Sequence, residues 1–302
     1  MRVLVLTSGG DAPGMNMALA TLYKKYKKNL FACRAGFRGL INGDILPMSE
    51  FDVLKQARKA GSVIKSSRCP EFKSPEGFSK ALENAREYDV VIVLGGNGSY
   101  KGCCELAQNG VRTVFIPATI DNDVMCSDYS LGYHTAVQAC INTIKNVTPS
   151  MEALNRSCIF EVMGRYCPRI AKSVNHSYQC DYLITDKKDI NYKEMAKILK
   201  EKHSKWQSCV IVLKENIIKP NTIIRNLNKL EPDIEVKSVT VGYLQRGSKP
   251  TLIELEYARK FASLAIAYIK KCDNSFALAY KDNGFEIILR NEDGKFLNKK
   301  LK

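Results

Sequence analysis

The chain has 302 residues, 45% hydrophobic and 25% charged, with a formal net charge of +15. This length and composition are typical of one large or two medium globular domains and exclude a disordered chain. The lysines are dispersed, which favours a solvated basic surface suited to anionic metabolites over a nucleic-acid-binding stripe, and no apolar run approaches the roughly 20 residues that span a bilayer.

Short apolar runs alternate with helix-length amphipathic stretches along the chain. Most of the runs are continuously apolar, as expected for strands buried on both faces of a parallel sheet. The expected strands are residues 2–7, 30–34, 89–94, 112–116, 157–162, 181–185, 209–213 and 236–241, and the clearest helices are residues 77–87, 136–146, 192–203 and 253–271. This alternation predicts an α/β fold with right-handed crossovers. Two α/β domains sharing one cleft fit the length.

Glycine-rich loops follow two of these strands. Ser-Gly-Gly-Asp-Ala-Pro-Gly occupies residues 8–14 and Gly-Gly-Asn-Gly-Ser occupies residues 95–99, each leading into a helix. Ligands of parallel sheets bind at the carboxyl ends of strands, where glycine and a helix N-terminus let backbone N–H groups approach an anion. One such loop is as well explained by turn chemistry, but two in one sheet favour phosphate binding.

The next strand ends in Pro-Ala-Thr-Ile-Asp-Asn-Asp at residues 117–123. Two carboxylates two residues apart, with a hydroxyl two residues earlier, suit phosphoryl transfer: one accepts the attacking hydroxyl's proton, another orders Mg²⁺, and the threonine contacts the moving phosphoryl group. Taken alone, the segment is equally typical of an Asx-rich turn.

Four arginines stand at strand ends or in loops beside these segments. The planar guanidinium group can bind a phosphate through two parallel hydrogen bonds. Each arginine alone is more typical of a surface position, but together with the glycine loops and the carboxylates they predict a phosphate-handling site. They are Arg68, Arg156, Arg165 and Arg246.

Taken together, these motifs resemble the bacterial 6-phosphofructokinase family. The resemblance rests on residues 7–16, the loop 117–123, Glu-Val-Met-Gly-Arg-Tyr-Cys at 161–167 and Gln-Arg-Gly at 245–247, and it runs collinearly over about the first 270 residues. It implies an ATP-dependent enzyme of glycolysis that transfers the γ-phosphoryl group to the 1-hydroxyl of fructose 6-phosphate, giving fructose 1,6-bisphosphate. Lipid and NAD kinases share a similar glycine loop but lack the other segments.

The resemblance also implies a fold: two Rossmann-like three-layer α/β/α domains with mainly parallel sheets and a shared active-site cleft. We expect a nucleotide-binding domain at residues 1–132 plus about 245–280, and a sugar-phosphate-binding domain at about 133–244 plus 281–302. The family further implies a homotetramer whose active sites are shared between subunits. Since the sequence has neither a membrane-length apolar run nor a nucleic-acid-binding motif, we expect a cytoplasmic protein with no nucleic-acid or membrane partner. The chain begins without a basic leader, so we expect no signal peptide.

Carried over position by position, the family's roles fall on the following residues. Asp121 resembles the general base, and Thr119 and Arg165 resemble transition-state contacts. The nucleotide site is implied at Gly10, Arg68, Cys69, Gly98, Ser99 and Gly102. The sugar phosphate is implied to contact Thr119, Asp121, Met163, Gly164, Arg165, Glu215, Tyr243 and Arg246, with Arg156 and Lys237 reaching in from a neighbouring subunit. Asn97 and Asp123 stand at the positions associated with Mg²⁺, which accompanies ATP.

The choice of phosphoryl donor depends on two small residues. Pyrophosphate-using relatives typically have an aspartate where Gly98 stands and a lysine where Ala118 stands, and these side chains fill the space of the ATP α-phosphate. The small residues here therefore imply ATP.

Several positions depart from the family pattern. Asn97 replaces an aspartate that binds Mg²⁺, so we expect weaker metal binding. Lys237 replaces an arginine and Tyr243 a histidine near the sugar phosphate, and Lys65 stands where a glycine is usual. The intact catalytic loop favours an active enzyme. Asn97 supports the alternative, a weakened or inactive paralogue that binds sugar phosphate or nucleotide as a regulatory subunit.

Two further features concern regulation and redox state. The basic residues of the family's allosteric pocket are replaced here, with Lys24 as the main survivor, so we expect no ordinary response to ADP or phosphoenolpyruvate. The replacements are Ala20, Glu50, Thr148, Ser204 and Gln207. The eleven cysteines lie mostly in core-like segments without a C-x-x-C pair, which predicts reduced thiols packed as small hydrophobes.

Overall fold

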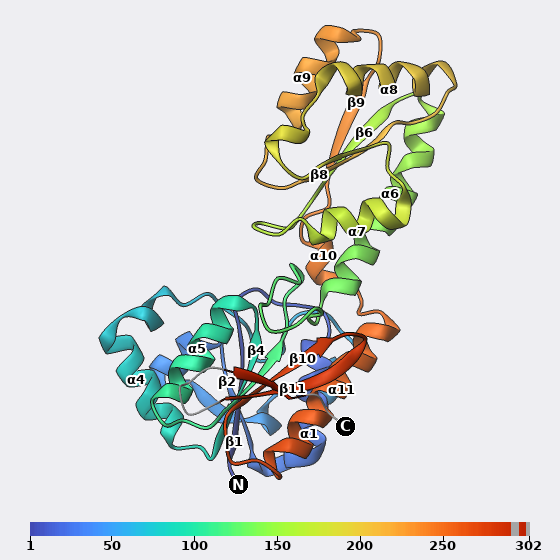
Figure 1. The fold of residues 1–302 in the computed structure, drawn as a ribbon. Helices are drawn as coiled ribbons and strands as arrows, with labels where there is room; N and C mark the ends of the chain where they lie inside the picture. Colours follow the sequence, from blue (N-terminus) through green and yellow to red (C-terminus); the bar gives the residue numbers. More distant parts are fainter. Residues whose placement is uncertain (291–295, 300–302) are drawn as a thin grey trace. The chain divides into compact units, whose positions relative to one another are not determined.

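The computed structural model describes residues 1–290 and 296–299, and the chain divides into two compact units (Figure 1). Unit 1 comprises Met1–His134 and Lys249–Lys302, and unit 2 comprises Thr135–Ser248. Within the described ranges, no helix is both long and apolar enough to cross a membrane.

Unit 1 is built on an eight-stranded sheet of order β12-β11-β10-β5-β4-β1-β2-β3. The central strands from β10 to β2 are parallel, while β3, β11 and β12 pair antiparallel at the two edges. The strands are β1 (Val3–Ser8), β2 (Leu30–Cys33), β3 (Ile45–Pro47), β4 (Val90–Gly95), β5 (Thr113–Pro117), β10 (Phe276–Lys281), β11 (Gly284–Arg290) and β12 (Phe296–Lys299).

Helices cover both faces of this sheet, because successive side chains of each buried strand point to opposite sides. Leu4, Leu6, Val91, Val93 and Phe115 pack in one core with side chains of α2, α4 and α5. The other face is covered by α1 and α11, which lie side by side (Figure 1). The helices are α1 (Met15–Tyr26), α2 (Phe37–Asn42), α3 (Val53–Gln56), α4 (Pro75–Arg86), α5 (Asn97–Gln108) and α11 (Leu252–Ile269), with 3₁₀ turns at Lys27–Asn29, Met48–Glu50 and Pro70–Lys73.

Unit 2 contains a parallel four-stranded sheet of order β7-β8-β6-β9. Helices α8 and α9 cover one face, where Met195, Leu199 and Leu227 pack against Ile159 and Ile211, and α7 contacts β7 and β8. The strands are β6 (Ser157–Val162), β7 (Tyr182–Ile184), β8 (Val210–Lys214) and β9 (Val236–Thr240). The helices are α6 (Tyr133–Ala153), α7 (Arg169–Tyr178), α8 (Tyr192–Ser204), α9 (Pro220–Leu230) and α10 (Leu244–Gly247), with a 3₁₀ turn at Lys187–Asp189.

The α/β fold with two mainly parallel sheets is confirmed, and each of the eight expected strands exists with its ends shifted by at most one residue. The placement of residues 281–302 in the second domain is wrong for the described part of that segment. β11 pairs with β10 from Phe276↔Leu289 to Lys281↔Gly284 and so extends the sheet of unit 1. This hairpin was not expected, because the pattern of continuous apolar runs indicates buried parallel strands and not an antiparallel pair; its turn at Asp282 and Asn283 has positive φ angles of 48° and 60°.

Candidate active site

Three loops of unit 1 begin at the carboxyl ends of neighbouring central strands. Ser8, Gly95 and Pro117 are in register on the adjacent strands β1, β4 and β5, so the segments that follow them emerge side by side. Two hydrogen bonds join the strand ends: Ser99 Oγ donates to the Ser8 carbonyl at 3.1 Å, and the Ala118 N–H donates to the Gly95 carbonyl at 2.9 Å. The two glycine loops at residues 8–14 and 95–99 and the loop at residues 117–123, called here the carboxylate loop, therefore belong to one site.

The glycines of the loop at residues 95–98 serve different purposes. A Cβ at Gly95 would lie 2.3 Å from Ser99 Oγ and 2.6 Å from the Ser8 carbonyl oxygen, so packing alone requires glycine there. A Cβ at Gly98 would meet nothing within 4 Å. Since neither packing nor a positive φ demands glycine at 98, the open space in front of the N-terminus of α5 is available to a ligand.

Helix α5 is also suited to anion binding because its first turn lacks a side-chain cap. Gly96 stands at the N-cap position and makes no side-chain hydrogen bond. The first backbone N–H groups of a helix have no intrahelical acceptor, and together with the helix dipole they favour a negatively charged group. A phosphate placed at this helix end would meet both conditions.

The loop from Thr119 to Asp123 is held in shape by its own polar groups. The Asp121 N–H donates to Thr119 Oγ1 at 3.3 Å, which leaves the threonine hydroxyl proton to donate elsewhere. Asn122 has a left-handed φ of 52° and is buried. Its amide donates to the Asp128 carbonyl at 2.9 Å and accepts from the Ser130 N–H at 2.7 Å. Asp121 and Asp123, on either side of this buried residue, are only half-buried.

The same loop carries an oxygen donor of the kind that would suit a magnesium ion. Asp123 supplies a half-buried carboxylate, and Mg²⁺ in kinase sites is usually held by one or two carboxylates plus substrate phosphates. The described residues contain no cluster of three or more His, Cys, Asp or Glu side chains able to hold a metal without such phosphates. The Asp123 carboxylate would suit a magnesium ion that phosphate oxygens also hold.

Asn97, the other residue expected to bind metal, makes two hydrogen bonds to this loop. Its Nδ2 donates to the Asp123 carbonyl at 2.7 Å, and its Oδ1 accepts from the Met125 N–H at 3.1 Å. The asparagine thus joins α5 to the backbone of the carboxylate loop.

The remaining residues expected at the nucleotide site lie in unit 1 in two different settings. Gly10 and Arg68 are exposed, and the Gly9 N–H donates to the Ser67 carbonyl at 3.0 Å, which brings their two segments together. Cys69 is half-buried, and burial raises the pKa of its thiol. Gly102 is buried, and a Cβ there would lie 2.9 Å from the Phe37 ring, so its glycine is explained by packing.

In unit 2, the segment after β6 is fixed by side chains from the end of β8 and from α10. The Gly164 N–H donates to Glu215 Oε1 at 3.2 Å, and the Met163 N–H donates to Oε1 of the fully buried Gln245 at 3.1 Å. The Nζ of Lys214, only 7% exposed, donates to the Arg165 carbonyl at 3.4 Å. These contacts hold the backbone while the Arg165 side chain stays exposed.

Arg165, Tyr243 and Arg246 lie at this same end of the unit 2 sheet. The Arg165 guanidinium lies over the Tyr166 ring, 5.0 Å from its centroid. Tyr243 is 82% exposed, and the Arg246 N–H donates to its carbonyl at 3.0 Å. Whereas Thr119 and Asp121 lie in unit 1, the carboxyl ends of β6, β8 and β9 carry all the unit 2 residues expected to contact the sugar phosphate except two.

Those two, Arg156 and Lys237, lie at the opposite end of the sheet. Cys158 pairs with Lys237 where β6 and β9 begin, and both cations form ion pairs with the Glu235 carboxylate. The six residues of β6 separate Arg156 from Met163, and seven steps of extended chain correspond to about 20 Å. Within one chain, Arg156 and Lys237 are therefore not part of the Met163–Arg246 group.

The match to a family model explains why these residues occur together. The model described as phosphofructokinase matches residues 2–269. The chain belongs to the phosphofructokinase family.

Curated members of the family resemble the chain over most of its length. Proteins named ATP-dependent 6-phosphofructokinase are 32% identical in Paenibacillus macquariensis, over 99% of this chain and 94% of theirs, and 31% identical in Finegoldia magna, over 93% and 90%. The protein of the same name from Lactobacillus delbrueckii subsp. bulgaricus is 33% identical over 88% and 85%.

Solved structures show the same fold. The Pichia pastoris phosphofructokinase in the T-state matches with a TM-score of 0.85 and 23% identity over 95% of this chain. This chain spans 36% of the length of that longer chain. The pyrophosphate-dependent phosphofructokinase from Nitrosospira multiformis matches with a TM-score of 0.80 and 14% identity, over 100% of this chain and 86% of its own.

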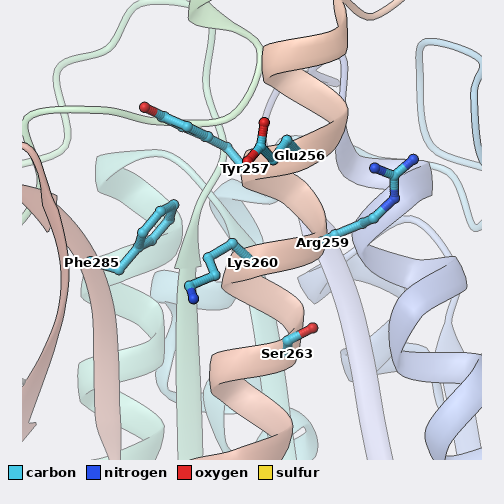
Figure 2. A pocket seen from close by; sticks show the side chains of 6 residues that line it. All are labelled: Glu256, Tyr257, Arg259, Lys260, Ser263 and Phe285. Carbon is cyan, nitrogen blue, oxygen red and sulfur yellow. The ribbon is translucent and has the colours of Figure 1, made fainter.

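A cavity of about 330 Å³ opens elsewhere in unit 1, between α11 and β11 (Figure 2). Phe285 comes from β11 and the other lining residues come from α11; together they are Glu256, Tyr257, Arg259, Lys260, Ser263 and Phe285. None of the site residues expected from the sequence lines it. We therefore assign it no part in the candidate active site.

Sequence reasoning missed the side chains that hold the site in place. Asn122 and Gln245 stand inside recognised motifs, but a motif does not indicate which of its residues point inward. Lys214 ends a continuously apolar strand, and a lysine that is buried in a core strand is unusual enough to be noticed. Ser130, whose hydroxyl donates to the Thr119 carbonyl at 2.7 Å, carried no sequence signal.

Proposed function

We propose that this protein is an ATP-dependent 6-phosphofructokinase, converting fructose 6-phosphate and ATP to fructose 1,6-bisphosphate and ADP. One observation carries the proposal: the Thr119–Asp123 loop begins beside the uncapped N-terminus of α5, because the strands β1, β4 and β5 end in register. The curated relatives' names favour this enzyme over the regulatory-subunit alternative.

In the proposed reaction, the 1-hydroxyl oxygen of the sugar phosphate forms a bond to the γ-phosphorus of ATP. The bond from that phosphorus to the β,γ-bridging oxygen breaks, and ADP leaves. Asp121 accepts the hydroxyl proton, and the half-buried position of its carboxylate keeps it accessible for that role. The Thr119 hydroxyl, already accepting from the Asp121 N–H, donates a hydrogen bond to the moving phosphoryl group.

ATP is proposed as the donor because Gly98 leaves open space at the helix N-terminus. Gly10, Arg68, Cys69, Ser99 and Gly102 are proposed for the remainder of the nucleotide site. Asp123 would hold Mg²⁺, whose charge, when bound, offsets that of the β- and γ-phosphates.

For the sugar phosphate, we propose contacts from the carboxyl ends of the unit 2 strands. Arg246 binds the 6-phosphate, with Tyr243 donating a further hydrogen bond. Glu215, Met163 and Gly164 contact the sugar, and Arg165 stabilises the charge of the transition state. Glu215 combines this role with its bond to the Gly164 N–H.

Arg156 and Lys237 are proposed to serve the active site of a neighbouring subunit in a cytoplasmic homotetramer. The proposal follows from their position at the far strand ends, about 20 Å from Met163 in the same chain. Two inactive variants test it: Asp121→Asn and Arg156→Ala subunits, mixed and reassembled, should regain activity because some hybrid sites contain neither substitution. Hybrids as inactive as both parents would contradict shared sites.

The activity itself is tested by coupled assays of both products, ADP and fructose 1,6-bisphosphate. Asp121→Asn removes the base with almost no change in shape, so kcat should fall by about 10²–10⁴. Asp128→Asn, at an exposed carboxylate in the same loop region, is the matched control and should keep wild-type turnover. A wild-type protein that makes neither product, or an Asp121→Asn variant of full activity, would sink the proposal.

A further inference from the structure

The position of the Asn97 amide differs from what a magnesium ligand requires. Asn97 is the first residue of α5, and both ends of its amide bond the backbone of the loop at 123–125. An amide has two donors and one acceptor oxygen. Here one donor is fixed on the Asp123 carbonyl, and the oxygen accepts from the Met125 N–H, so the plane and rotation of the amide are both set by the protein.

We propose that Asn97 is a positioning residue: its amide fastens the Asp121–Asp123 segment to the N-terminus of α5, and it is not a ligand of Mg²⁺. The inference rests on the proposed phosphotransferase function for its catalytic meaning, although the contact itself does not. An aspartate at this position could still accept from the Met125 N–H, but it could not donate to the Asp123 carbonyl.

The chemistry of the two groups supports this assignment. Mg²⁺ requires near-ideal octahedral geometry at about 2.0–2.1 Å and is reluctant to lose its waters. A neutral amide oxygen already engaged by a backbone N–H is a poor replacement for a water molecule. The Asp123 carbonyl, by contrast, would lose its 2.7 Å donor if residue 97 were acidic, and its partially negative oxygen would face the negative charge of a carboxylate.

Fastening the loop at this point has a direct consequence for the base. Asp121 and Asp123 lie on either side of the buried Asn122, whose own bonds run to Asp128 and Ser130. Asn97 holds the segment from the opposite side, through residues 123 and 125. With both sets of bonds in place, the two carboxylates are presented in a fixed arrangement before any substrate binds, which is the condition for efficient positioning.

Three variants test the inference by hydrogen–deuterium exchange of the substrate-free protein and by steady-state kinetics. Asn97→Asp removes only the donor, and Asn97→Ala removes donor and acceptor. Asn109→Asp makes the same chemical change at the other end of α5, where Nδ2 donates to the Glu105 carbonyl at 2.9 Å. It controls for added charge and for a lost bond to a helix carbonyl.

We expect faster exchange at residues 123–125 in both Asn97 variants, by about fivefold for each hydrogen bond of roughly 1 kcal/mol, and no change there in Asn109→Asp. In the kinetics, kcat should fall while the Mg²⁺ concentration for half-maximal rate stays within about twofold of the wild-type value. A merely structural role elsewhere in α5 would not confine the exchange to this loop.

The contrary outcome is equally definite. If Asn97 is the metal ligand, Asn97→Asp lowers the half-maximal Mg²⁺ concentration and raises kcat, while Asn97→Ala raises the Mg²⁺ requirement, and exchange at residues 123–125 stays at the wild-type rate. A wild-type protein without phosphofructokinase activity would refute the proposed function, yet the exchange comparison would still decide whether Asn97 fastens the loop.

Discussion

Asn122, at the centre of the catalytic loop, offers a test of how that loop is stabilised. It is 4% exposed, with a left-handed φ of 52°, and its amide bonds the Asp128 carbonyl and the Ser130 N–H. Asparagine tolerates this φ, whereas alanine is strained there by about 1–2 kcal/mol. We therefore expect Asn122→Ala to weaken both the stability of unit 1 and the catalytic rate.

The magnitude follows from the groups that lose partners. Ser130 is 1% exposed, so leaving its N–H without the Asn122 acceptor costs about 1–3 kcal/mol. With the backbone strain, Asn122→Ala should lower the free energy of unfolding by about 3 kcal/mol. Asn122→Gly loses the same bonds without the strain and should be about 1 kcal/mol more stable than the alanine variant.

The measurement must report on unit 1. The single tryptophan, Trp206, belongs to unit 2, so urea unfolding is better followed by circular dichroism together with hydrogen exchange at the Ser130 amide. Exchange there should accelerate in both variants. An alanine variant at least as stable as the glycine variant would refute the strain reasoning, and an unchanged Ser130 amide would refute the hydrogen-bond reasoning.

Three further predictions concern the nucleotide site, two buried thiols and the response to effectors. Gly98→Asp places a carboxylate in open space at the N-terminus of α5, where it stabilises the helix but repels nucleotide phosphates. Thermal stability should therefore be kept while the KM for ATP rises about tenfold. Gly98→Ala is the control, and an unchanged KM for ATP in Gly98→Asp would place the nucleotide elsewhere. Burial raises the pKa of Cys126 and Cys209 to about 12. A disulfide reagent at pH 8 should therefore label neither thiol until urea is added, and peptide mapping measures this labelling. Rapid labelling of the native protein would contradict the prediction. Ala20 is buried, and the buried Thr148 hydroxyl donates to the Ile144 carbonyl, so neither side chain replaces a lost effector cation. We expect millimolar ADP or phosphoenolpyruvate to leave the fructose 6-phosphate saturation curve unchanged. A several-fold shift of that curve would overturn this expectation.

The sequence was enough to predict the alternation of strands and helices and the two glycine loops. These features depend on local chemistry: continuous apolar runs bury themselves on both faces of a sheet, and glycines mark the turns at strand ends. The motif spacing also identified the family, and the residues of the loop 117–123 were recognised without any knowledge of their contacts.

Only the tertiary structure decided which side chains hold the site and which residues it brings together. Asn97 was expected to bind metal, but its amide bonds residues 123 and 125, and a sequence does not encode the rotation of an amide about its side chain. Arg156 and Lys237 were expected to reach the sugar phosphate from a neighbouring subunit, and the structure places them at the end of the unit 2 sheet opposite Met163, where both pair with Glu235. The segment at 284–290 forms β11 of the unit 1 sheet because it pairs antiparallel with β10. Each of these outcomes depends on contacts between residues distant in the chain, which local patterns do not determine.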